Sequence, residues 1–170
     1  GDSGEATTVE WTLPDGVTAG PLQFPYPHRI EVPPLVNFGY EGTVLHLTDL
    51  QIPASAKPGD TIALKADAVW LVCAEVCIPE EGVLTLDLPV AADAGTADAA
   101  TAAEFAAARA AMPTPSPWPA TASVDGSTLT LRLDAPQLAE AGLASAVLFP
   151  QSGGYIKNAA PQTVETSGGS

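Results

Sequence analysis

The 170-residue chain is acidic, with a formal net charge of −14 and only six Lys and Arg residues. Nucleic acids and anionic lipid surfaces are bound by clusters of cationic side chains, so this composition excludes nucleic-acid binding and disfavours binding to anionic lipid. The hydrophobic content of 46% suits a packed core and excludes general disorder. No run approaches the roughly 18 apolar residues of a membrane-spanning helix, and the polar residues 1–4 do not resemble a signal peptide.

Residues 1–92 have the pattern of a β domain. Candidate strands with alternating or continuous apolar character occupy residues 8–13, 43–47, 61–72 and 83–90. Breakers that contain Pro or Gly separate them, among them Pro33-Pro34 and Pro79. Short strands at this spacing predict a mainly all-β fold, with a sandwich over residues 1–92. Such a sandwich has about seven strands, so we expect its first strands to be missing from this chain.

Residues 93–119 predict a short helix followed by a Pro-rich linker. Thr101 and Glu104 have the spacing of a capping box, and an Ala-rich run follows, which predicts a helix over residues 101–112. We expect this helix to pack between two modules. Four prolines between residues 113 and 119 then form a stiff, extended connector.

Residues 120–170 predict the start of a second β module. Strands at residues 122–124 and 128–133 flank Asp125-Gly126, which is a strong hairpin signal. A helical turn is expected at residues 137–141 and a further strand at residues 146–149.

The chain has two cysteines, Cys73 and Cys77, in the segment WLVCAEVCIPE. On one continuous strand their Cα atoms would lie roughly 13 Å apart, at about 3.3 Å per residue. A disulfide needs Cα atoms within about 7 Å of each other. Either the thiols stay unpaired, or the chain reverses at residues 74–76 and the cysteines face each other across a three-residue hairpin loop. The strand pattern on both sides favours the hairpin.

A disulfide that closes so small a ring contributes only about 2 kcal/mol to stability. Strained, accessible disulfides are typically the labile and catalytic ones, so we favour a redox-active pair over an inert staple or a buried reduced pair. Glu75 and Glu80 lie close in sequence, and negative neighbours disfavour the thiolate. We expect a slow nucleophile that reacts within a docked complex, with no cofactor beyond the cysteine pair and no bound metal.

The main alternative is a copper-binding and delivery module. A Cys-x3-Cys pair with a histidine suits a soft copper site, and His28 and His46 are available. However, His46 lies in an alternating strand pattern and His28 in an expected loop, where neither needs a metal. Thioredoxin-like folds, including copper chaperones, place a helix directly after the second cysteine, whereas Ile78-Pro79 and a strand follow Cys77 here.

Several segments carry a resemblance to a known family. They are WLVCAEVCIPE, WTLP from Trp11, NFGYE from Asn37, FAAAR from Phe105 and PSPWP from Pro115. Over nearly its whole length the chain resembles the N-terminal periplasmic region of the thiol–disulfide interchange protein DsbD family, especially its ScsB (suppressor of copper sensitivity) members. The resemblance implies a periplasmic immunoglobulin-like domain of a protein-disulfide reductase, with links to copper tolerance and cytochrome c biogenesis. Its implied partners are the membrane-embedded domain of the same protein, which donates electrons, and periplasmic thioredoxin-fold proteins, which receive them.

The resemblance also implies roles for individual residues. Cys77 forms the mixed disulfide with the partner and Cys73 resolves it. Phe38, together with Tyr40, belongs to a cap loop that shields the pair, although these rings taken alone suit a core-facing strand. The chain departs from the family's enteric pattern in its closer cysteine spacing and in its cap, where the nearest acid is Glu41. We expect Glu41, Glu75 and Glu80 to modulate the pKa of the thiols.

Overall fold

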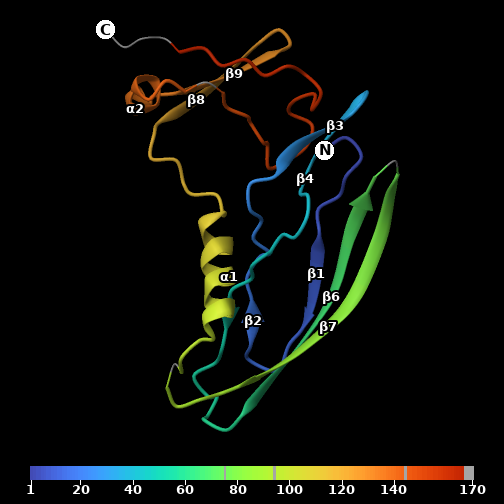
Figure 1. Ribbon diagram of the computed structural model, residues 1–170, viewed down its shortest axis with the longest axis vertical. Coiled ribbons are helices and arrows are strands. Elements are labelled where there is room, and N and C mark those ends of the chain that lie inside the picture. Colours follow the sequence, from blue (N-terminus) through green and yellow to red (C-terminus); the bar gives the residue numbers. More distant parts are fainter. Residues whose placement is uncertain (75, 94, 144, 167–170) are drawn as a thin grey trace.

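Antiparallel strands dominate the computed structural model, which describes residues 1–166 except 75, 94 and 144 (Figure 1). The elements are β1 (Thr8–Thr12), β2 (Thr18–Ala19), β3 (His28–Val32), β4 (Leu35–Gly39), β5 (Leu50–Gln51), β6 (Thr61–Cys73), β7 (Cys77–Pro89), α1 (Ala99–Ala110), β8 (Ala120–Asp125), β9 (Thr128–Leu133) and α2 (Pro136–Glu140). The predicted mainly β, immunoglobulin-like fold is confirmed.

The longest strands belong to one sheet with the order β1-β6-β7, and the pairs β2-β5, β3-β4 and β8-β9 form smaller antiparallel sheets. Strand β6 is central because it pairs with β1 on one side and with β7 along its whole length on the other. Figure 1 shows β6 and β7 as a long, curved hairpin along one side of the molecule. This hairpin positions the cysteines.

The core lies against the first half of β6. Side chains alternate between the two faces of a strand, and in β6 the even-numbered residues Ile62, Leu64, Ala66 and Ala68 are buried. Ile62 and Leu64 cluster with Val17, and partly buried apolar residues pack around them: Trp11, Leu13, Leu50 and Val90. The buried row ends before the cysteines: Val72, on the same face of β6, is 48% exposed.

Several expected strand boundaries are wrong. Pro79 does not break the second long strand, because β7 begins at Cys77 and Pro79 pairs with Leu71. Strand β7 lies at the edge of its sheet, where a proline without an N–H group is tolerated. The expected strand at residues 43–47 is reduced to one bridge from Leu47 to Gln23, and residues 146–149 form no strand. The hairpin of β3 and β4, which turns at Pro33-Pro34, was not expected.

The predicted helix is present, but its start differs. The N-cap of α1 is Asp98 and not Thr101, because the Asp98 carboxylate accepts the Thr101 backbone N–H at 2.9 Å. Near the end of α1, Ala108 is buried, and the Ala111 carbonyl accepts the Tyr26 N–H at 3.3 Å. This end of the helix therefore contacts the β domain. Within the described residues, no helix is long and apolar enough to cross a membrane.

The hairpin at Asp125-Gly126 is confirmed, since β8 and β9 pair from Ala120↔Leu133 to Asp125↔Thr128. The helical turn expected at residues 137–141 corresponds to α2. Whether residues 120–170 fold as a separate module stays a prediction.

The burial of β6 predicts unequal costs for two leucines that pair directly across β6 and β7. Leu64 is 6% exposed and Leu86 is 56% exposed. Leu64→Ala should lower the free energy of unfolding by about 2–5 kcal/mol, because it leaves a cavity. Leu86→Ala should cost less than about 1 kcal/mol. Urea denaturation measures both, and equal losses would show that another surface covers Leu86 in solution.

Candidate redox site

The two cysteines face each other at the end of a long antiparallel ladder. Strands β6 and β7 pair without interruption from Thr61↔Pro89 to Cys73↔Cys77. The cysteine Cα atoms lie 4.0 Å apart and the sulfurs form a disulfide. In the loop between them, the Ala74 N–H donates to the Val76 carbonyl at 3.2 Å. The predicted hairpin and the pairing of the thiols are confirmed. A strand begins at Cys77, where a thioredoxin-like fold would have a helix.

The disulfide joins the last residue of β6 to the first residue of β7, at the tip of the hairpin that these strands form (Figure 1). Cys73 is exposed and Cys77 is half-buried. Three aliphatic neighbours are also exposed: Val72 by 48%, Val76 by 67% and Ile78 by 56%. A second protein can therefore reach the sulfurs, and it would bury apolar surface as it docks.

Glu80 accepts a hydrogen bond from Trp70, and Trp70 lies three residues before Cys73 in the chain. These residues pair across β6 and β7, and the Trp70 indole Nε1–H donates to the Glu80 carboxylate at 3.1 Å. The indole also lies over Gly82, where an added Cβ would meet the ring at 3.2 Å. Sequence reasoning did not single out Trp70. Gly82 pairs with Ala68, two residues before Trp70 on the same face of β6, so the contact between the indole and Gly82 follows from the register of the strands. Glu75, the other expected acid, lies outside the described residues.

Phe38 lies within β4, on the same face as Val36, which is 4% exposed. Its ring forms an edge-to-face pair with the Phe149 ring, with 5.3 Å between the centroids and an angle of 88° between the planes. The position within a strand and the partly buried ring agree with the core-facing interpretation of the sequence. A capping role for Phe38 stays a prediction.

Tyr40 follows β4 and belongs to a small aromatic cluster. Its hydroxyl donates to the Pro25 carbonyl at 2.8 Å, and burial raises the pKa of this phenol. Its ring lies 5.5 Å from the ring of His46, whose other neighbour is Phe24 at 4.7 Å. Glu41, next in the chain, is exposed.

Neither histidine lies as expected. His28 begins β3, opposite Gly39, and is not in a loop, whereas His46 lies outside the regular strands. Burial between the rings of Phe24 and Tyr40 lowers the pKa of His46, and a hydrogen bond with the Gln23 backbone raises it to a smaller extent. The buried Nδ1 atom of His46 has no hydrogen-bond partner among the described residues. Across all the residues that the structure describes, no three His, Cys, Asp or Glu side chains lie close enough together to hold a metal ion.

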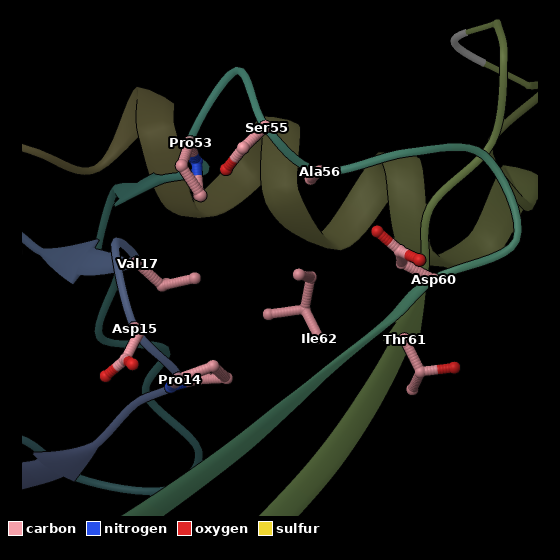
Figure 2. A pocket seen from close by; sticks show the side chains of 9 residues that line it. All are labelled: Pro14, Asp15, Val17, Pro53, Ser55, Ala56, Asp60, Thr61 and Ile62. Atoms are coloured by element: carbon pink, nitrogen blue, oxygen red, sulfur yellow. The ribbon is translucent and has the colours of Figure 1, made fainter.

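A hollow in the surface lies at the other end of β6 (Figure 2). Ile62 and Val17 face it from the core, and the carboxylates of Asp15 and Asp60 lie near its rim. Ile62 is eleven residues from Cys73 on one strand, which is roughly 36 Å at about 3.3 Å per residue. The hollow is therefore separate from the disulfide.

The comparison with family models agrees with the chemistry of this hairpin. The model of "Thiol:disulfide interchange protein DsbD, N-terminal" matches residues 3–89, just over half of the chain. The chain therefore belongs to this family, whose activity is thiol–disulfide exchange, and the matched region contains both cysteines. No curated protein and no solved structure gives a significant match.

The environment of His46 predicts a dependence of stability on pH. Its pKa is lowered in the folded protein from 6.5, so the unfolded chain binds a proton more readily. The free energy of unfolding should decrease as the pH is lowered through 6.5, and the contribution should be complete above that value. His46→Phe keeps an aromatic ring beside Phe24 and Tyr40 and should flatten this slope. Denaturant titrations at several pH values test this, and an unchanged slope in the variant would contradict it.

Proposed function

We propose that this chain is a periplasmic electron-relay domain of a protein-disulfide reductase. It accepts electrons from the membrane-embedded domain of the same protein and passes them to periplasmic thioredoxin-fold proteins. The observation that carries the proposal is the Cys73–Cys77 disulfide at an exposed hairpin tip, in a chain of the DsbD N-terminal family. The ScsB resemblance extends the proposal to copper tolerance, and the DsbD family extends it to cytochrome c biogenesis.

The proposed exchange needs only the two cysteines and the partner's disulfide. In the reduced domain one cysteine loses its proton, and its thiolate attacks a sulfur of the partner. The partner's S–S bond breaks, a mixed disulfide forms, and the displaced thiolate takes up a proton. The second cysteine then attacks the mixed disulfide, so the Cys73–Cys77 bond forms again and the partner leaves as a dithiol. Two electrons and two protons pass to the partner, and a dithiol of the membrane domain restores the reduced pair.

Two considerations differ on which cysteine attacks. The family resemblance assigns the attack to Cys77, and we retain this assignment. Exposure favours Cys73, because the attacking sulfur must reach the partner and Cys77 is half-buried. Single-cysteine variants separate the two possibilities.

We expect Cys73→Ala, which retains Cys77, to attack a partner disulfide faster than Cys77→Ala, which retains Cys73. The probe is a thioredoxin with one active-site cysteine, joined as a mixed disulfide to 2-nitro-5-thiobenzoate. Release of the yellow thiolate gives the rate, and Cys73→Ala with Cys77→Ala in one chain is the blank. A faster Cys77→Ala variant would reassign the attack to Cys73. No reaction above the blank with either variant would refute the exchange function.

We propose that Phe38 shields the pair and moves aside when a partner docks. Phe38→Ala should then speed reduction of the disulfide by dithiothreitol between about twofold and about tenfold, the range expected for loss of one aromatic contact. Exchange with thioredoxin should change less, because a docked partner displaces the ring in either protein. If neither rate changes, the ring contributes only packing, and the exchange function stands without a cap.

A further inference from the structure

The segment after α2, described over residues 141–166 except 144, runs beside the β3–β4 hairpin (Figure 1). Phe149 of this segment makes the edge-on contact with Phe38 of β4. The two rings come from parts of the chain that are far apart in sequence. The contact therefore joins the strand of the proposed cap to the C-terminal part of the chain.

Hydrogen bonds within the same segment restrain the backbone next to Phe149. The side-chain amide of Gln162 accepts the Leu148 N–H at 2.7 Å and donates to the Leu148 carbonyl at 3.2 Å. Both backbone groups of the residue before Phe149 are thus bound by one side chain. This arrangement restricts the backbone that carries the Phe149 ring.

A second contact ties the same segment to β4. Asn158 donates from its amide to the Asp2 carboxylate at 2.9 Å. The other carboxylate oxygen of Asp2 accepts the Val36 N–H at 2.7 Å, and the Asp2 N–H donates to the Val36 carbonyl at 3.0 Å. The segment therefore holds β4 at two places, directly at Phe38 and through Asp2 at Val36.

We propose that Phe149 is a positioning residue for Phe38, so that the C-terminal segment sets how readily the Phe38 ring moves. This inference rests on the proposed cap. An edge-to-face pair favours one orientation of each ring over others. Loss of Phe149 lowers the cost of moving Phe38, and a more mobile cap admits small reagents more often. The C-terminal segment thereby influences a disulfide that it need not touch.

The test measures reduction of the Cys73–Cys77 disulfide by dithiothreitol in the whole chain. Phe149→Ala should speed reduction between about twofold and about tenfold, which corresponds to the interaction free energy of one aromatic pair. Phe149→Tyr keeps the aromatic ring and should react at the original rate. Tyr155→Ala is the matched control, because it removes a ring of the same segment that is 75% exposed. Unfolding midpoints of all variants identify any rate change caused by lost stability alone.

The variant with both Phe38→Ala and Phe149→Ala distinguishes positioning from general loosening. If Phe149 acts through Phe38, its removal adds nothing once Phe38 is absent, and the double variant reacts like Phe38→Ala. Multiplying effects, or an unchanged rate in Phe149→Ala, would overturn the proposal. An unchanged rate in Phe38→Ala would overturn the cap together with the role of Phe149. Exchange with thioredoxin, measured on the single-cysteine variants, stands or falls independently of these results.

Discussion

The reversal of the chain between Cys73 and Cys77 is the constraint on which the rest of the site depends. It places Cys73 directly opposite Cys77 and fixes the register of every other pair in the β6–β7 hairpin. A shift by one residue would turn the buried row of β6 toward solvent, because neighbouring side chains point to opposite faces. The burial of Ile62 and Leu64 at one end thus specifies the same register that the disulfide needs at the other.

The hairpin divides these two tasks along its length. The half of β6 that begins at Thr61 supplies core residues, and the half that ends at Cys73 extends beyond the core to the exposed tip of the hairpin. Breaking or forming the disulfide therefore disturbs few buried contacts. A sulfur pair that must alternate between two oxidation states is well placed at such a tip, because the core remains packed in both.

Sequence reasoning predicted the parts of this arrangement that local patterns determine. The cysteine spacing, the apolar runs on both sides and the disulfide distance limit together favoured a hairpin over unpaired thiols on one strand. The expectation for Pro79 failed because tolerance of proline depends on whether a strand lies at the sheet edge, which is a tertiary property. The start of α1 was misplaced because Asp98 and Thr101 are both good caps, and only the backbone geometry selects between them.

Contacts between distant segments left no signal in the sequence. Phe38 and Phe149 meet only because the segment after α2 returns to β4, and no periodicity in either segment indicates this. The same is true of the bond between Asp2 and Asn158. A sequence motif identified Phe38, whereas the geometry was needed to show what surrounds it.

The distribution of charge and apolar surface bears on how such a domain selects a partner. The chain is strongly acidic, but the side chains that flank the disulfide at the tip include Val72, Val76 and Ile78, all exposed. Long-range attraction from the acidic body raises the rate of encounter with cationic surfaces, and it weakens with salt. Burial of the apolar tip depends on close fit and is much less sensitive to salt. In the proposed relay, charge therefore sets how often a partner arrives, whereas the fit of its surface to the tip decides whether the sulfurs meet.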